Sequence, residues 1–240
     1  MFNKLLTNES VILDLIKANI KRNNRLLVTY LNQNCFNVYS HNIFYKNLLD
    51  NNFKIYVDGI GISLALRILF GKPYKHFNAT DLNEKILDIL IKQKIKFFII
   101  GGNFSKDELN KKFGLIDCFV GYNSGYFLEN EFYEIAKKIS LLEPDVIVLG
   151  MGVPRQEIIA EKLSQTIGAS IFLCVGNYLE FYLGTVKRIP HRYRNKGLEW
   201  IYRLFQEPKR LWKRYFIGIP LFIFRVIKFK LSINKIDSTT

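Results

Sequence analysis

The sequence predicts an α/β fold: a Rossmann-like parallel sheet with helices on both faces, followed by a basic helical appendage. Three observations lead to this prediction. Short apolar runs alternate with helical patterns over residues 1–184, and within the runs apolar residues follow one another rather than alternating with polar ones. Continuous apolar runs are typical of strands that are buried on both faces of a parallel sheet. Beyond residue 184 the alternation stops and basic residues accumulate, so we expect two parts, 1–184 and 185–240.

Six apolar runs are the expected strands, at residues 26–31, 54–57, 96–100, 116–120, 145–150 and 170–175. The expected helices of the first part cover residues 37–50, 61–70, 80–93, 105–113, 129–142 and 154–166. We expect Thr80 to cap the helix that begins there, because a threonine hydroxyl can accept a hydrogen bond from a free helical N–H group. In the appendage we expect helices at 197–206, 207–216 and 217–230.

Glycine-containing turns follow most of the expected strands, at residues 58–59, 101–103, 121–123, 150–152 and 176–177. In a parallel sheet these turns share the edge at which ligands bind. Glycine at this edge lets backbone amides approach a phosphate group. Tight turns between strands and helices favour glycine for their own sake, and the sequence supports the two interpretations equally.

Positive charge is concentrated near the C-terminal end. The formal net charge is +14, and residues 187–230 hold 13 Lys or Arg residues with only two acidic ones. Such a local field implies an anionic partner: a phosphate group, nucleic acid or an acidic membrane surface. A solvated patch that only aids solubility is the alternative. The aromatic and aliphatic residues that interleave with these charges favour a partner.

The apolar run at residues 215–224 indicates membrane contact. Its ten residues lie between Arg214 and Arg225. They are too few to span a bilayer, which takes about 20 apolar residues, but they suit a helix in the interface with its flanking cations at headgroup phosphates. A helical hairpin that covers the sheet is the alternative. No signal peptide is expected, and the three scattered cysteines indicate a reducing compartment.

Asp58 is the first candidate for chemistry. It directly follows an expected buried strand and precedes Gly59 and Gly61. A carboxylate at the ligand-binding edge can serve as a general base that removes a proton from an attacking hydroxyl group. An aspartate that caps the following helix explains the same spacing at least as well. The two glycines lack the third glycine of a dinucleotide-binding fingerprint, so a nicotinamide cofactor is not expected.

The segment Gly-Met-Gly-Val-Pro-Arg-Gln-Glu at residues 150–157 is the second candidate. Pro154 is expected at the start of a helix. Arg155, Gln156 and Glu157 would then project from the first turn, where the helix N-terminus favours an anion or a polar sugar. The arginines of the C-terminal segment are the third candidate, because guanidinium groups bind phosphate bidentately and can stabilise a departing diphosphate.

Other kinds of chemistry are not expected. The sequence has no Asp-x-Asp motif, no P-loop and no Gly-x-Ser-x-Gly motif, and His41, His76 and His191 are not at metal-ligand spacings. We therefore expect no metal and no cofactor. A nucleic-acid-binding protein is an alternative from a different class. Because the charge is confined to one end and no recognised binding motif is present, no nucleic-acid partner is expected.

A series of short motifs runs along the chain from about residue 28 to 215. In order, they are Asp58–Gly61, Arg67 with Gly71 and Pro73, Asn78–Leu82, Ile100–Gly102, Gly125–Phe127, Pro144–Asp145, Gly150–Glu157, Val175–Gly176, Gly184, Lys187–Pro190, Gly197–Leu204 and Glu207–Arg210. This pattern resembles the WecG/TagA/CpsF family of glycosyltransferases. The resemblance implies an inverting, metal-independent transfer of an N-acetylmannosamine-type sugar. The UDP-sugar donor is a substrate, and the acceptor is a polyprenyl-diphosphate-linked saccharide of cell-surface polysaccharide or teichoic-acid-type biosynthesis.

The resemblance also implies roles for particular residues. Asp58 is the expected general base, and Gln156 is expected at the donor sugar. In two places the sequence departs from the family pattern, with Tyr30 in place of a threonine and His76 in place of an arginine. Both departures put the donor sugar in question, and a family member that binds without catalysing is a further alternative. The expected location is the cytoplasmic, inner face of the membrane, and a homodimer or homotrimer is compatible with the resemblance.

The candidate residues fall into two groups. Those expected at the donor are Tyr30, Asn32, Gly59, His76, Asp81, Gly101, Gly102, Gly125, Tyr126, Gly150, Gly152, Arg155, Gln156, Glu157 and Gly176. Those expected at the diphosphate, once the appendage docks on residues 1–184, are Arg188, Arg203, Arg210 and Arg214.

Overall fold

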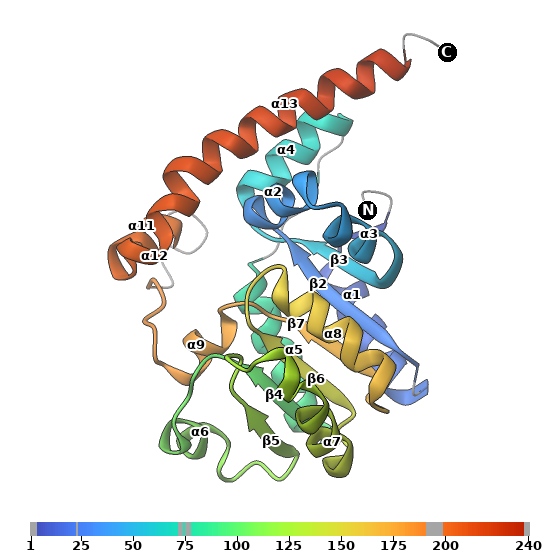
Figure 1. The fold of residues 1–240 in the computed structure, drawn as a ribbon, viewed down its shortest axis with the longest axis vertical. Helices are drawn as coiled ribbons and strands as arrows, with labels where there is room; N and C mark the ends of the chain where they lie inside the picture. The colour runs from blue at the N-terminus through green and yellow to red at the C-terminus, as the bar shows by residue number, and fades with distance from the viewer. Residues whose placement is uncertain (1–3, 23, 72–73, 75–77, 191–198, 238–240) are drawn as a thin grey trace.

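A computed structural model describes residues 4–22, 24–71, 74, 78–190 and 199–237. Its centre is a seven-stranded parallel sheet in the order β1-β3-β2-β7-β6-β4-β5 (Figure 1). The strands are β1 (Leu5–Leu6), β2 (Leu26–Leu31), β3 (Phe53–Val57), β4 (Phe97–Gly101), β5 (Phe119–Asn123), β6 (Val146–Gly150) and β7 (Ile171–Cys174). The predicted α/β fold with a parallel sheet is confirmed.

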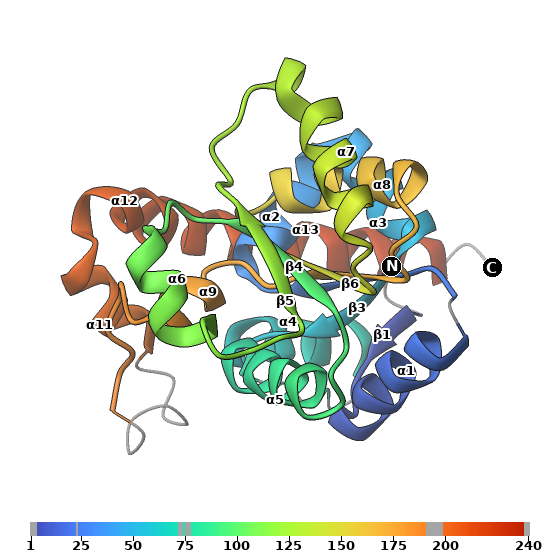
Figure 2. The same cartoon turned by 90° about the horizontal axis from the view of Figure 1, so that it is seen from below.

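Helices cover both faces of the sheet. On one face lie α3 (Ile43–Asn52), α7 (Phe132–Leu142) and α8 (Arg155–Thr166), and on the other lie α1 (Glu9–Arg22) and α5 (Ala79–Lys92) (Figure 2). The inner strands β2, β7, β6 and β4 are almost wholly buried, which explains their apolar runs in the sequence, whereas the edge strands β1 and β5 are half-buried.

The chain crosses from one half of the sheet to the other after β3. β2 pairs with β3 on one side and with β7 on the other, whereas β4 lies beyond β6. The connection from β3 to β4 carries α4 (Ile60–Phe70) and α5. The carboxyl ends of β2, β3 and β7 are therefore neighbours at a topological switch point, where open α/β sheets bind ligands.

Asparagine side chains set two helix boundaries that differ from the prediction. The single helix expected at 37–50 is two helices, α2 (Gln33–His41) and α3, because Asn42 is extended between them and its side chain accepts a hydrogen bond from the Tyr45 N–H. The prediction that Thr80 caps α5 is wrong. Asn78 is the cap, and its side chain accepts a hydrogen bond from the Thr80 N–H.

Three elements were not predicted: the two-residue strand β1, the 14-residue helix α1 and the short helix α9 (Tyr178–Leu183). The strand expected at 116–120 begins three residues later, because Ile116 and Phe119 take part in consecutive turns. The remaining elements of this part are α6 (Lys106–Phe113) and the short 3-10 helix η2 (Glu129–Glu131).

The C-terminal segment is helical and packs against the sheet part. It contains α11 (Glu199–Gln206), α12 (Pro208–Trp212), a five-residue π-helical turn η3 (Lys213–Ile217) and α13 (Gly218–Asp237). α13 is longer than the expected 217–230 and lies along α2 and α4 (Figure 1). Among the helices of the described residues, none has the length and apolar content that crossing a membrane requires.

Candidate functional site

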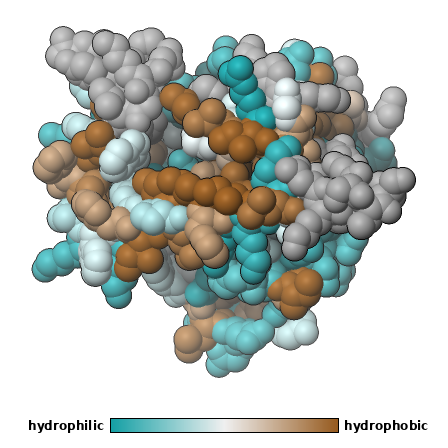
Figure 3. Space-filling view, turned by 90° about the horizontal axis from the view of Figure 1, so that it is seen from above, coloured by the Kyte–Doolittle hydropathy of each residue, from teal (hydrophilic) through white to brown (hydrophobic). Residues whose placement is uncertain are grey.

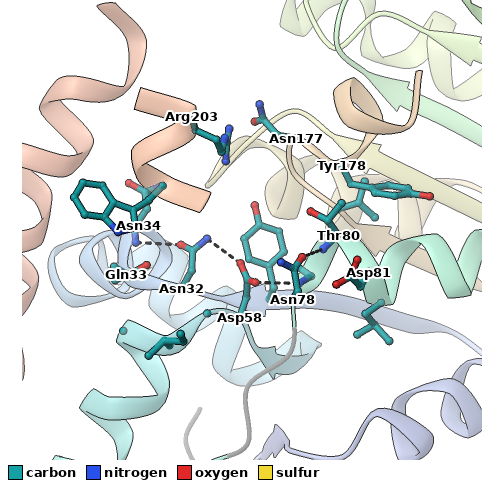
Figure 4. Close-up of a pocket in the computed structure, with 18 of the residues that line it drawn as sticks. Asn32, Gln33, Asn34, Asp58, Asn78, Thr80, Asp81, Asn177, Tyr178 and Arg203 are labelled. Atoms are coloured by element: carbon teal, nitrogen blue, oxygen red, sulfur yellow. Dashed lines mark hydrogen bonds between the residues drawn. The ribbon is translucent and has the colours of Figure 1, made fainter. Parts of the chain in front are cut away.

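A cavity of about 910 Å³ lies at the carboxyl ends of β2, β3 and β7. Its walls come from the starts of α2, α4 and α5, from the segment after β7, and from α11, η3 and the start of α13. In Figure 4, Arg203 and Asn177 lie across the cavity from Asn32, Asp58 and Asn78. The sheet part and the C-terminal segment therefore build this cavity together.

Asp58 lies on the cavity wall directly after β3. Its Oδ1 accepts a hydrogen bond from the Ala79 N–H at 3.0 Å, and its Oδ2 accepts one from the Asn32 side chain at 3.4 Å. The N-cap of α4 is Gly59, with φ +87° and no side-chain cap. The interpretation of Asp58 as the cap of the following helix is therefore wrong. Its carboxylate instead joins the end of β2 to the start of α5, beside the cavity (Figure 4).

Asn32 fixes the geometry of the β2 end. Its Oδ1 accepts hydrogen bonds from the N–H groups of Asn34 and Cys35, both at 3.1 Å, and so caps α2. The Nδ2 group of the same side chain then points to Asp58. One buried asparagine thus couples the start of a helix to the candidate base.

The start of α5 binds Arg188, which was expected at the diphosphate. The Arg188 guanidinium donates to Asp81 at 2.7 Å and to Asn78 at 2.9 Å. Asp81 and Asn78 line the cavity, whereas Arg188 does not. Arg188 therefore connects the segment after α9 to the start of α5. The first N–H group of α5, that of Ala79, donates to Asp58.

Two of the appendage arginines line the cavity, Arg203 from α11 and Arg214 from η3. The Arg203 side chain is only 14% exposed and packs over the Phe181 ring at 5.4 Å. Two of its nitrogen atoms, Nε and Nη2, are buried, and no acceptor in the described part of the chain forms a hydrogen bond with them. Nη2 lies 3.8 Å from a Glu207 carboxylate oxygen, which is an ion pair without a hydrogen bond. A cavity lined by two guanidinium groups suits an anionic ligand.

Arg210 is not on the cavity wall. Its guanidinium pairs with Glu207 and lies 4.0 Å from Glu180. It also reaches Asn177, which does line the cavity, at 3.5 Å. Arg210 therefore contacts the rim of the cavity through Asn177 rather than the interior.

Gln156 and Glu157 were predicted to project toward a ligand, and this prediction is wrong. Both side chains are fully buried beneath the edge of the sheet. Gln156 accepts a hydrogen bond from the Gly176 N–H at 3.0 Å and donates to Glu157 at 2.8 Å. The Thr29 hydroxyl donates to the same Glu157 oxygen at 2.7 Å. Burial raises the pKa of Glu157 to about 7, although these hydrogen bonds oppose the shift.

Tyr30 borders this buried network on its cavity side. Its ring lines the cavity. A Cβ atom at Gly176, which has φ +59°, would lie 2.3 Å from the Tyr30 hydroxyl oxygen, so glycine is required there. Burial, with the nearby Cys35 and Glu157, raises the pKa of Tyr30 well above its ordinary value, so the hydroxyl stays protonated.

The glycines at the ends of β4 and β6 do not line the cavity. Close packing of the turns against one another accounts for glycine at these positions. A Cβ atom at Gly101 would lie 2.6 Å from the Gly150 carbonyl oxygen, and one at Gly125 would lie 2.8 Å from Met151. The Gly125 N–H donates to the Gly102 carbonyl group. Gly152 has φ +77°, which favours glycine in the turn before α8.

Two further donor candidates belong to this glycine region. Tyr126 is exposed. Arg155 donates to the Phe127 carbonyl oxygen and packs over the Phe127 ring at 5.0 Å. Of the predicted donor residues, Tyr30, Asn32, Gly59 and Asp81 line the cavity beside Asp58, the predicted base. Gln156, Glu157 and Gly176 form the buried network, and the others that the structure describes belong to the glycine region. His76 lies outside the described residues.

Several cavity residues were not among the predicted site residues. They include Gln33, Asn34, Asn37, Asn78, Lys85, Asn177, Tyr178, Phe181, Trp200, Tyr215 and Ile219. Asn177 had a usable signal, because it directly follows the glycine at the end of β7. Trp200 and Tyr215 pack with ring centroids 5.4 Å apart and belong to the aromatic residues that interleave with the basic segment.

The fold and the cavity define an α/β enzyme that binds its ligands at a topological switch point. Residues 3–236 match the Glycosyl transferase WecG/TagA/CpsF family. The chain is 30% identical over 225 residues to the N-acetylglucosaminyldiphosphoundecaprenol N-acetyl-beta-D-mannosaminyltransferase of Staphylococcus aureus strain MRSA252, covering 91% of this chain and 85% of that protein. The strain MW2 protein of the same name gives the same identity and coverage. The chain belongs to the WecG/TagA/CpsF family and is a hexosyltransferase.

Proposed function

We propose that this chain transfers N-acetylmannosamine, or a closely related sugar, from a UDP donor to a polyprenyl-diphosphate-linked saccharide. The names of the Staphylococcus aureus relatives describe N-acetylmannosamine transfer to N-acetylglucosaminyldiphosphoundecaprenol. The observation that carries the proposal is one cavity with a carboxylate, Asp58, on one wall and two arginines, Arg203 and Arg214, on another.

Asp58 is the proposed general base. It removes the proton from the acceptor hydroxyl group while the hydroxyl oxygen attacks the anomeric carbon of the donor sugar. The bond from that carbon to the diphosphate oxygen breaks on the opposite side, so the configuration inverts. The hydrogen bonds from Ala79 and Asn32 hold the carboxylate in place on the cavity wall.

Arg203 and Arg214 are the proposed partners of the diphosphate. The UDP leaving group carries away the electrons of the broken bond, and its growing negative charge needs cations or N–H donors nearby. Arg203 and Arg214 both line the cavity, so their guanidinium groups place positive charge on its wall, although Arg203 Nη2 also lies 3.8 Å from a Glu207 carboxylate oxygen. We propose that these arginines act in place of a bound metal ion.

The donor sugar is the least constrained part of the proposal. Tyr30 and Asn177 lie on the cavity wall beside the buried Gln156 network. Tyr30 presents a neutral hydroxyl group and a large ring where the family pattern has a threonine. We therefore infer that the pocket takes a hexose whose substituents tolerate this narrower site, with N-acetylmannosamine as the first to test.

Membrane association completes the proposal, because a polyprenyl-linked acceptor resides in a bilayer. We propose that the C-terminal segment holds the enzyme at the inner, cytoplasmic face of the membrane, through the basic residues and exposed apolar side chains of α12, η3 and α13. Assembly into a homo-oligomer is also proposed on the family resemblance alone.

The test is UDP release from a panel of UDP-sugars, with a lipid-diphosphate-linked N-acetylglucosamine acceptor in anionic liposomes. We expect release with one donor, dependent on the acceptor and insensitive to EDTA. Asp58→Asn should abolish turnover and leave UDP binding, measured by calorimetry, within about twofold of the wild type. Near-normal turnover of a folded Asp58→Asn variant would show that another group is the base.

Two other results would redirect the proposal. Donor binding without turnover, with every acceptor tried, would indicate a binding protein that has lost catalysis. Salt-dependent binding to nucleic acid, with no affinity for anionic liposomes, would favour a nucleic-acid partner for the basic segment.

A further inference from the structure

Helix α4 carries a stripe of exposed apolar side chains, Ile60, Leu64 and Ile68. Among the described residues, no other element of the sheet part covers this stripe. Ile60, Leu64 and Ile68 are 45%, 55% and 52% exposed. They are four residues apart along the helix and so lie on one face. α4 has no acidic residue in its sequence, IGISLALRILF. An exposed stripe of three large aliphatic side chains is unusual for a helix whose other face is already buried in a core.

α13 lies beside this stripe and extends it. Its side chains Ile223 and Ile227 are exposed, as are Phe224 and Leu231. The space-filling view from above shows apolar side chains gathered across this face, over α13 and α4 (Figure 3). The exposed apolar surface is therefore shared between a helix of the sheet part and a helix of the C-terminal segment.

Specific contacts fix α13 to the sheet part. Arg225 donates to the backbone and side-chain oxygens of Asn37, at 2.7 and 3.0 Å, and Asn37 donates to the Gly218 carbonyl oxygen at 2.8 Å. The Lys230 ammonium group donates to the Leu69 carbonyl oxygen at the end of α4, at 3.0 Å. The two apolar stripes are thus held in one arrangement.

The charges around this face point to an anionic surface. Residues 208–236 contain no aspartate or glutamate. Their basic residues are Lys209, Arg210, Lys213, Arg214, Arg225, Lys228, Lys230 and Lys235. Along α12, η3 and α13 the one acidic residue is Asp237 at the end of α13, so the aliphatic side chains there are flanked mainly by cations. Such a surface suits the boundary between acyl chains and anionic headgroups.

The same stripe leads into the cavity. Ile60, at the start of α4, and Ile219, at the start of α13, both line the cavity. Asp58 is two residues before Ile60. A molecule with a lipid tail on this face could therefore present its polar end to Asp58 without leaving the apolar surface.

We propose that α4 is a membrane-binding element in its own right: its stripe of Ile60, Leu64 and Ile68 enters an anionic lipid surface together with α13, so that the cavity opens toward the bilayer between these two helices. This inference rests on the proposed function, in which the acceptor is lipid-linked. It differs from that proposal because it assigns membrane contact to the sheet part and gives the direction from which the acceptor arrives.

The test measures lipid binding without the reaction, so that its failure is distinct from failure of the transferase proposal. Co-sedimentation with vesicles of phosphatidylglycerol and phosphatidylcholine is compared for the wild type and the double variant Leu64→Ser/Ile68→Ser. Because two large aliphatic side chains leave the lipid, we expect binding to weaken about tenfold or more. The matched control is Leu115→Ser/Leu141→Ser, which changes two exposed leucines of the sheet part outside this face and should bind like the wild type.

A second measurement reports on α4 directly. The three native cysteines are buried, so a polarity-sensitive thiol dye can be attached selectively to a Leu64→Cys variant. We expect a blue shift with the anionic vesicles and quenching by brominated lipids, neither of which should occur with dye at Leu115→Cys. Wild-type binding by the double variant, or an unshifted dye at position 64, would overturn the inference. A concentration-dependent dimer that the double variant dissociates would assign the stripe to a second copy of the chain instead.

Discussion

Glu157 offers a direct test of the buried network beneath the cavity. The perturbation is Glu157→Gln, which keeps the size of the side chain and one carbonyl oxygen for the hydrogen bonds from Thr29 and Gln156. The other carboxylate oxygen, Oε2, is buried, and the described residues give it no hydrogen-bond partner. The variant therefore removes an ionisable group and leaves most of the packing unchanged.

The magnitude follows from the pKa of Glu157, which burial raises from 4.5 to about 7. Between these values the folded state holds a proton that the unfolded state has already released. The contribution of Glu157 to the free energy of unfolding is therefore largest below about pH 4.5. It falls as the pH rises to about 7 and does not change further above that. A pKa shift of this size corresponds to about 3 kcal/mol of unfolding free energy.

The assay is urea unfolding of the wild type and Glu157→Gln at intervals from pH 5 to pH 8. All other titrations are shared, so the difference between the two free energies of unfolding isolates Glu157. We expect the wild type to lose about 2–3 kcal/mol relative to the variant as the pH rises from 5 to 7.5. A difference that stays constant with pH would refute the reasoning, because it would mean that Glu157 ionises in the folded state as it does in water.

Three further perturbations test the cavity and its support. Arg203→Ala should lower kcat/KM for UDP release about 100-fold at nearly unchanged stability. Arg203→Lys should retain only part of the wild-type kcat/KM. Equal kcat/KM of the wild type and both variants would exclude a role of Arg203 at the diphosphate. Arg188→Met removes the guanidinium hydrogen bonds to Asp81 and Asn78, so calorimetry should show a loss of about 2 kcal/mol and a Tm lower by about 4–8 °C. An unchanged Tm would show that these contacts add nothing. Gly101→Ala should cost about 2 kcal/mol or more in urea unfolding, since its Cβ would meet the Gly150 carbonyl oxygen; a neutral effect would mean that the two turns move apart freely.

The sheet could be predicted because its signal is local. Each central strand is a mainly apolar run of four to six residues, because most of its side chains are buried; the exceptions are the buried Thr29 of β2 and the exposed Lys54 of β3. β1 has only two residues and depends on pairing with β3, so its own sequence carries no such pattern. Helix boundaries failed where one asparagine side chain, Asn42 or Asn78, bonded the backbone and ended or began a helix.

The site was only partly predictable, because side-chain direction depends on packing that the sequence pattern does not state. Asp58 and Arg203 were found from their place after a strand and in the basic segment, and both line the cavity. Gln156 and Glu157 were expected to face a ligand, yet α8 turns them toward β2 and the segment after β7. The elements that pack against the first turn of a helix decide which of its faces is buried. In α8 the buried face carries the polar side chains of Gln156 and Glu157.

The buried polar groups that lack partners explain why so many polar residues cluster at this end of the sheet. Within the described chain, both Arg203 and Glu157 bury atoms without a hydrogen bond, and each such atom costs about 1–3 kcal/mol of stability. Glu157 can lower that cost by staying protonated, since its pKa is raised to about 7. Arg203 has no such option, because a guanidinium group remains charged at any working pH. The Glu207 carboxylate, 3.8 Å from Arg203 Nη2, offsets part of this cost by ion pairing, and an anion bound in the cavity that Arg203 lines would offset more of it.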